Sequence, residues 1–136
     1  MSHGRIRKIF SAVVAEYATQ KDIPVSYDNV SFKSGDVDHI ETHLIPADTF
    51  SDTLGGDHKA FIGMYQMTLV VQYNTGLLKA EQIAEELQNI FQINEMFTDG
   101  LGFSVQVTSP ITIPEGKQVG VQWRVPCYFE YRSDTN

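Results

Sequence analysis

Residues 39–43, His-Ile-Glu-Thr-His, carry two imidazoles and one carboxylate in a short stretch. Histidine and glutamate are both zinc ligands. In helical metalloproteases, two histidines four residues apart bind zinc, with a glutamate directly after the first of them. In this chain Ile40 follows the first histidine, so the order differs from that motif. The chemistry open to these residues therefore depends on whether the segment is a helix or a strand.

Apolar and polar side chains alternate from residue 39 to residue 44, which predicts a strand that Pro46 closes. On a strand, His39 and His43 lie about 13 Å apart at roughly 3.3 Å per residue, too far to share one ion. His39 and Glu41 remain neighbours on one face. The favoured interpretation is an exposed polar strand face.

A zinc site on that face is the less favoured alternative. It would use His39 and Glu41, with a third ligand from His3, His58 or a carboxylate. Other signatures of catalysis are weak. Gly55 and Gly56 are followed by an aspartate, which would repel phosphate, rather than by the lysine of a P-loop. No Gly-x-Ser-x-Gly elbow is present. We therefore expect neither an enzyme nor a bound cofactor.

The composition indicates one globular domain over residues 1–136, since 42% of the chain is hydrophobic. The net charge of −7 disfavours binding DNA through its phosphates. Arg5, Arg7 and Lys8 form the one basic group, which could contact nucleic acid or an acidic partner; the polar side of a helix is favoured. The single cysteine, Cys127, excludes an intrachain disulfide, fits a reducing cytoplasm, and is expected in the core. We expect no signal peptide and no membrane span.

The order of elements predicts an α+β domain, with two helices against one face of a largely antiparallel or mixed sheet. Apolar residues at helical spacing predict a first helix that ends before Pro24 and a second over 77–91. Alternation predicts strands over 61–74, 102–109 and 119–132, after short extended structure over 25–32 with a turn at Asp28 and Asn29. Residues 47–60 read as a long loop, and loops of this length in a compact domain are usually functional or mobile. Gly63 suggests a bulge, and Pro126 suggests an edge strand or a bulge.

Several segments in this order resemble a family of phage tail terminator proteins with the lambda-type fold. The segments are VSYDNVSF, LIPAD, LGG before GMYQMTLVVQY, TG before AEQIAEELQNIF, and WRVPCYFEYR, within residues 5–132. The resemblance implies a structural protein of the virion tail, assembled in the host cytoplasm. Such proteins form a hexameric ring that caps the finished tail tube, stops its polymerisation and offers a surface to head-completion proteins. DNA passes through the lumen without specific binding.

Within that reading, the loop is expected to contact a neighbouring copy or the tube protein. The expected interface residues are Phe50, Leu54, Gly55, Gly56 and His58, with Glu41 and His43 on the strand face. A head–tail connector or neck protein of similar size is the first alternative. A small metal-dependent enzyme that uses His39 and Glu41 is the second.

Overall fold

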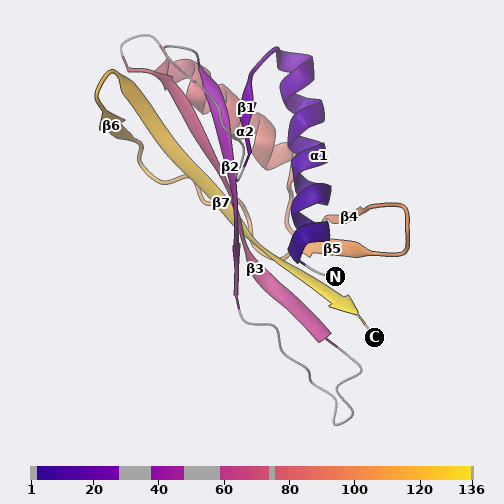
Figure 1. The fold of residues 1–136 in the computed structure, drawn as a ribbon. Helices are drawn as coiled ribbons and strands as arrows, with labels where there is room; N and C mark the ends of the chain where they lie inside the picture. The colour runs from indigo at the N-terminus through magenta and orange to yellow at the C-terminus, as the bar shows by residue number, and fades with distance from the viewer. Residues whose placement is uncertain (1–2, 28–37, 48–58, 74–75, 136) are drawn as a thin grey trace.

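A computed structural model of the chain describes residues 3–27, 38–47, 59–73 and 76–135. The turn expected at Asp28 and Asn29 lies outside the described residues, as do residues 48–58 of the expected loop. The elements follow one another from a first helix to a last long strand (Figure 1). In chain order they are α1 His3–Lys21, β1 Val25–Ser26, β2 His39–Pro46, β3 Lys59–Gln72, α2 Leu77–Ile90, β4 Met96–Thr98, β5 Ser104–Val107, β6 Lys117–Val119 and β7 Gln122–Thr135.

The described strands form one sheet in the order β1-β2-β3-β7-β5-β4, with β6 paired to β7. Only the β1–β2 pair is parallel, and the other described pairs are antiparallel. The β3–β7 pair is the longest and runs from Lys59 opposite Thr135 to Gln72 opposite Gln122. The expected α+β class with a largely antiparallel, mixed sheet is confirmed.

Both helices pack on the same face of this sheet, as predicted. Tyr65 and Phe129 are cross-strand partners on β3 and β7. From α1, the Phe10 ring lies 5.1 Å from the ring centroids of both Tyr65 and Phe129. From the end of α2, Phe91 stacks on Phe129 at 4.9 Å. Aromatic pairs at these separations add to the stability gained by burying their area, so this cluster ties both helices to the spine of the sheet.

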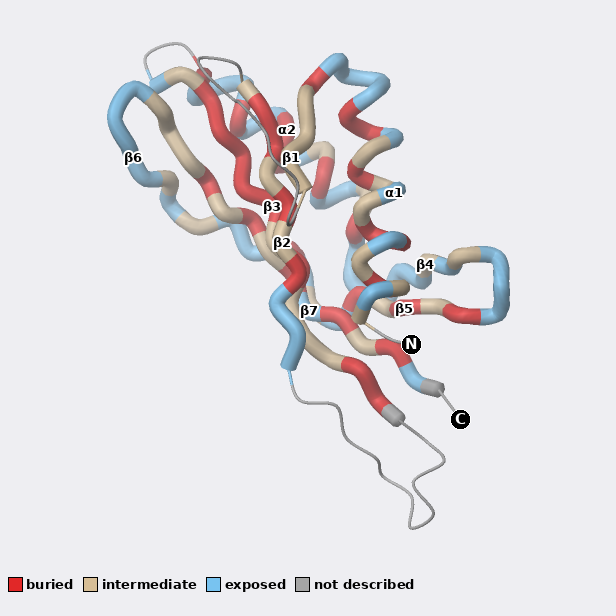
Figure 2. The backbone as a smooth tube through the Cα atoms, viewed as in Figure 1, coloured by how far each residue is buried: buried red, intermediate tan, exposed pale blue. Residues whose placement is uncertain are grey.

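Both predicted helices are present in the structure, as α1 and α2. Val14 is fully buried, whereas Val13 is only partly buried against the core. The burial pattern shows the same one-sided arrangement, with red segments where the helices face the sheet and pale blue along their outer sides (Figure 2). Among the described residues, neither helix combines the length and hydropathy that crossing a membrane requires.

The expected strand over 119–132 is instead two elements that form a hairpin. Gly120 has a φ of 62° between β6 and β7, a left-handed conformation that glycine adopts without strain. β3 also begins earlier than expected, at Lys59. The sequence prediction missed β4, whose three residues are too few to show a period.

Pro126 lies inside the sheet, so the expectation of an edge strand is wrong. The N–H of Tyr128 donates to the carbonyl of Thr112 (3.1 Å), on the side of β7 away from β3. The backbone N–H groups of an antiparallel strand point alternately toward its two neighbouring strands. An N–H at position 126 would therefore point to the same side as that of Tyr128, away from β3. Pro126 falls between the Arg124–Lys117 pair and the Tyr128–Thr112 bridge, and its missing N–H costs the β3–β7 ladder nothing.

Gly63 occupies a regular position in the ladder, opposite Pro46 and Tyr131, rather than a bulge. The absence of a side chain at Gly63 lets the Ile45 backbone and the Tyr131 ring approach it closely. A Cβ added there would lie 2.6 Å from the Ile45 carbonyl oxygen and 2.6 Å from the Tyr131 hydroxyl. The Tyr131 ring therefore fills the space above this residue.

We predict that Gly63→Ala destabilises the protein by about 1–3 kcal/mol, because the methyl group overpacks a site closed by backbone and a buried ring. Urea denaturation would measure the change. Gly4→Ala is the matched control, since a Cβ on Gly4 meets no atom within 4 Å. An unchanged unfolding midpoint for Gly63→Ala would contradict this account of the glycine.

Candidate functional site

The face of the sheet opposite the helices is the first candidate surface. On β2, Ile40, Thr42 and Leu44 face the helices and are buried. The residues between them therefore project from the other face, because side chains alternate along a strand. His39, Glu41 and His43 share that face with Arg124, which lies two strands away on β7.

Glu41 is the centre of a polar network on this face. Arg124 Nη2 donates to Glu41 Oε1 at 2.5 Å. His39 Nε2 lies 3.0 Å from Glu41 Oε2, and His43 Nε2 lies 4.0 Å from Glu41 Oε1. Because β3 separates β2 from β7, the Arg124 side chain crosses β3 to reach this carboxylate. Glu41 thus links His39 and His43, the other two residues of the predicted polar strand face.

The strand face is less exposed than the sequence predicts. His39 is buried at 2% exposure, so for His39 the expectation of an exposed residue is wrong, and the Glu41 side chain is only 22% exposed. The crossing arginine gives the physical reason, since it covers the middle of the face. Val70 and Thr68 of β3, which lie under its path, are buried as well.

The Glu41 carboxylate is held ionised. Burial alone raises the pKa of Glu41, but hydrogen bonds from Arg124 and His39 outweigh it and bring the pKa below its ordinary value. A carboxylate with both oxygens engaged is poorly placed to act as a general acid or base at neutral pH. Its geometry is that of an ion pair that ties β2 to β7.

The described residues contain no group of three or more histidine, cysteine or carboxylate side chains that could hold a metal ion. His3, considered above as a third ligand, lies on α1 on the opposite face, where its Nδ1 is 2.8 Å from the Tyr131 hydroxyl. His58 lies outside the described residues. The geometry gives the zinc alternative no support among the residues the structure describes.

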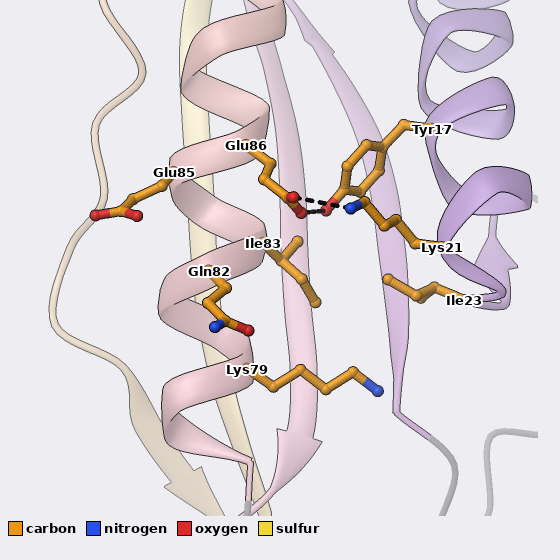
Figure 3. Close-up of a pocket in the computed structure, with 8 residues that line it drawn as sticks. All are labelled: Tyr17, Lys21, Ile23, Lys79, Gln82, Ile83, Glu85 and Glu86. Atoms are coloured by element: carbon orange, nitrogen blue, oxygen red, sulfur yellow. Dashed lines mark hydrogen bonds and ion pairs between the residues drawn. The ribbon is translucent and has the colours of Figure 1, made fainter.

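A groove between the two helices, about 370 Å³ in volume, contains a second set of polar side chains (Figure 3). The Tyr17 hydroxyl donates to Glu86 Oε1 at 2.6 Å, and Lys21 Nζ lies 2.9 Å from Glu86 Oε2. Burial and the contact with Glu86 raise the pKa of Tyr17. Lys79, at the other end, pairs with Asp38 at 3.0 Å. The contacts of Tyr17 and Lys21 with Glu86 join α1 to α2, and the Lys79–Asp38 pair joins α2 to the residue before β2.

Cys127 is buried on the core face of β7, as the sequence predicts. Burial raises the pKa of its thiol to about 11, so the reactive thiolate is scarce at neutral pH. The residue packs as a small core hydrophobe and not as a nucleophile.

A groove of about 530 Å³ opens where β2 ends and β3 begins. Ile45, Pro46 and Ala47 form one wall, and Ile62 and Met64 of β3 also line it. Residues 48–58 follow this wall directly in the sequence. The predicted interface residues Phe50, Leu54, Gly55, Gly56 and His58 lie outside the described residues, while Glu41 and His43 lie in the network described above.

Sequence reasoning missed two exposed apolar regions. One is the β4–β5 hairpin, where Leu101 is 82% exposed and Met96 is 56% exposed. The other lies at the start of α2, where Leu78 is 68% exposed near the β6–β7 turn. A signal was present in the sequence, because Leu101 stands between two glycines in a turn and Leu78 follows Leu77 at a helix start. Neither leucine belongs to a regular helical or strand pattern of apolar residues that would predict its burial.

Comparison with known proteins gives one family. A family model described as "Phage tail terminator protein" matches residues 5–131. A solved protein structure that carries no functional name superposes with a TM-score of 0.81 at 28% identity, and the match covers 98% of this chain and 96% of that one. No curated protein matches the chain.

We predict that Glu41→Gln destabilises the protein by about 1–3 kcal/mol at pH 7, the range for losing a charge-assisted hydrogen bond. The native pKa of Glu41 is depressed, so its stabilisation is present above the unfolded pKa and is lost as the pH falls through the native value. The difference in stability between wild type and variant should therefore shrink as the pH falls below 4.5, the ordinary pKa of glutamate. Urea unfolding midpoints at pH 7 and pH 3 would measure it, and a constant difference would contradict the ion-pair assignment.

Proposed function

The chain belongs to the phage tail terminator family, and from this premise we propose that it caps the finished tail tube as a ring of six copies. In this proposal the ring stops addition of tube protein and offers a surface to a head-completion protein. The protein acts by assembly in the host cytoplasm and stays in the virion tail. It has no catalytic role. The observation that carries the proposal is the family match over residues 5–131.

The form of the molecule supports a ring. A closed ring of identical copies needs a heterologous contact, in which two different surfaces of the chain meet. Exposed apolar side chains occur in separate places, at the β4–β5 hairpin, at the start of α2 and at Ile45 beside segment 48–58. Scattered apolar residues are normal on a surface, but several clusters on one small domain favour contacts with other chains.

The charge distribution supports a hole through which DNA can move. The chain carries a net charge of −7. At least five of its ten basic residues are paired with carboxylates of the same chain: Arg5, Lys21, Lys79, Arg124 and Arg132. At least half of the basic residues are thus neutralised within the chain, and with the net charge of −7 a ring of such copies would repel DNA phosphates more than it held them.

Segment 48–58 is proposed to contact the neighbouring copy or the tube protein. The groove wall formed by Ile45, Pro46 and Ala47 leads into it, and Ile45 is 43% exposed. Apolar surface beside a segment with Phe50 and Leu54 favours an apolar contact that forms on assembly.

We predict that the double variant Phe50→Ala/Leu54→Ala caps purified tail tubes at least about tenfold less well while its thermal unfolding stays unchanged, because apolar anchors carry most interface energy. Tube length in a polymerisation assay would be the readout. Thr53→Ala, in the same segment, is the matched control. Capping by the double variant as efficient as by wild type would remove this segment from the interface.

The same assay separates the proposed function from the connector alternative. A terminator binds the ends of tail tubes that lack heads. A connector or neck protein binds instead to heads that contain the portal and ignores isolated tubes. Binding to such heads alone would overturn the proposal in favour of that reading.

A further inference from the structure

We propose that the Asp99–Gly100 pair, in the turn of the β4–β5 hairpin, is a site of aspartate isomerisation that its contacts in the folded chain keep unreactive. Arg5 and Thr98 are the residues that protect it. An aspartate followed directly by a glycine occurs only here in the chain, and no asparagine is followed by a glycine. The modification lies outside the proposed tail role and needs no partner protein.

The reaction consumes and returns one water molecule. The Gly100 backbone nitrogen attacks Cγ of Asp99 and loses its proton, and one carboxyl oxygen leaves as water, which closes a five-membered succinimide ring. Water then opens the ring at either of its two carbonyls, and gives back aspartate or leaves isoaspartate, in which the main chain runs through the side-chain carboxyl group. A glycine favours the closure because no side chain hinders its nitrogen. Gly100 is exposed, so water reaches the turn.

The Asp99 carboxylate is bound on both of its oxygens. Oδ1 accepts hydrogen bonds from the Leu101 N–H (2.8 Å) and the Phe103 N–H (3.4 Å). Oδ2 accepts hydrogen bonds from two nitrogens of the Arg5 guanidinium, Nε at 3.0 Å and Nη2. Ring closure removes one of these oxygens as water, so the contacts on that oxygen must break before the ring can form.

The same contacts keep the carboxyl group in its less reactive form. The hydrogen bond from the Leu101 backbone and the Arg5 guanidinium lower the pKa of Asp99. An ionised carboxylate repels the attacking nitrogen and has no hydroxyl group to lose as water, whereas the neutral acid has one. A lower pKa therefore leaves less of the reactive neutral form at pH 7.

Arg5 is held beside Asp99 by a second contact. Its guanidinium lies over the Phe103 ring, 4.5 Å from the ring centroid, and the face of an aromatic ring attracts a cation. Phe103 is buried, so the ring is a fixed support for the guanidinium. The arginine of α1 is thus positioned before any reaction in the hairpin can begin.

The attacking nitrogen is restrained as well. The Gly100 N–H donates to Thr98 Oγ1 at 3.1 Å, and the Thr98 hydroxyl donates in turn to the Phe103 carbonyl at 2.9 Å. Ring closure must bring the Gly100 nitrogen to bonding distance of the Asp99 carboxyl carbon, and these hydrogen bonds oppose that movement. Both reacting groups are therefore held by contacts of the folded chain.

Isomerisation would undo the attachment of the hairpin to α1. Isoaspartate adds one methylene group to the main chain of the turn, and its free carboxylate projects from a different carbon atom. The bonds from Leu101, Phe103 and Arg5 cannot then all form on one carboxylate. The hairpin projects beside α1 (Figure 1), and the Arg5–Asp99 pair is a polar link between the two. The protecting contacts and the link are therefore the same bonds.

Peptide mapping after long incubation tests the proposal. The folded chain, and the same chain unfolded in guanidinium chloride, would be kept at pH 7 and physiological temperature for several weeks and then digested with trypsin. The peptide that follows Lys79 and ends at Lys117 contains Asp99 as its only aspartate. Electron-transfer fragmentation would identify isoaspartate in this peptide at unchanged mass, whereas deamidation of Asn89 or Asn94 would add mass.

We expect isoaspartate to form in the unfolded chain and to be scarce in the folded wild type. Arg5→Gln should raise the rate in the folded chain about tenfold at pH 7, the rate equivalent of one charge-assisted hydrogen bond. Lys8→Gln is the matched control and should change the rate far less, because it removes a positive charge from the same groove without touching the guanidinium contact. Circular dichroism would check that the variants stay folded.

Two further variants separate the chemistry from a general loosening of the hairpin. Asp99→Glu should give no isoaspartate, because its longer side chain would have to close a six-membered ring. Thr98→Val removes the acceptor of the Gly100 N–H, should also raise the rate, and serves as the test if Arg5→Gln does not fold. The rise of the rate with acidity should begin at higher pH in Arg5→Gln than in wild type, because Asp99 loses a group that lowers its pKa.

Three results would overturn the proposal. The first is an unfolded chain that forms no isoaspartate at Asp99, which would show that the pair is not a reactive site. The second is an equal rate in the folded and unfolded chains, which would show that the fold gives no protection. The third is a wild-type rate in Arg5→Gln or Thr98→Val when that variant stays folded, which would remove the protecting role of that residue.

Discussion

The fourteen-residue antiparallel pairing of β3 with β7 is the constraint on which the rest of the structure depends. It sets which residues face the helices and which face the opposite side. On one face it places Tyr65 beside Phe129, and Phe10 and Phe91 attach the helices to them. On the other it brings Arg124 within reach of Glu41 across β3. A shift of register by one residue would exchange the two faces and lose both arrangements.

The one-sided packing explains why polar chemistry in this chain is used for structure. On the face without helices, Glu41 is paired to Arg124, and in the groove between the helices Glu86 is paired to Tyr17 and Lys21. Both carboxylates keep lowered pKa values: burial opposes this at Glu41 but is outweighed by Arg124 and His39, and at Glu86 the Tyr17 hydrogen bond is the main cause. The groups that could do chemistry therefore join elements of the fold, which agrees with a family named for a structural role in the phage tail.

Much of this fold could be predicted from the sequence, because both helices and the long strands have clear periods of apolar residues. The alternation at residues 39–44 correctly separated the two faces of β2. It could not show that His39 is buried, since the arginine that covers this face comes from a strand far along the chain. The alternation of apolar residues gave no sign of β4, which has three residues. Pro126 led to the wrong prediction of an edge strand, because the local sequence does not reveal toward which neighbouring strand its missing N–H would point. Of the expected contact residues, Glu41 and His43 lie among the described residues, while Leu101 had no predicted role.

The distance along the chain between β3 and β7 has a consequence for how the molecule forms. Even the closest pair in their ladder, Gln72 with Gln122, is separated in sequence by α2, β4, β5 and β6. Contacts this remote are slow to form, because a long loop must close before the pairing stabilises it. During synthesis, β3 leaves the ribosome before β7, so the edge of β3 that pairs with β7 stays unpaired until the last strand is made. The nascent chain is then open to misassociation, and chaperones would act in the interval before the last strand arrives.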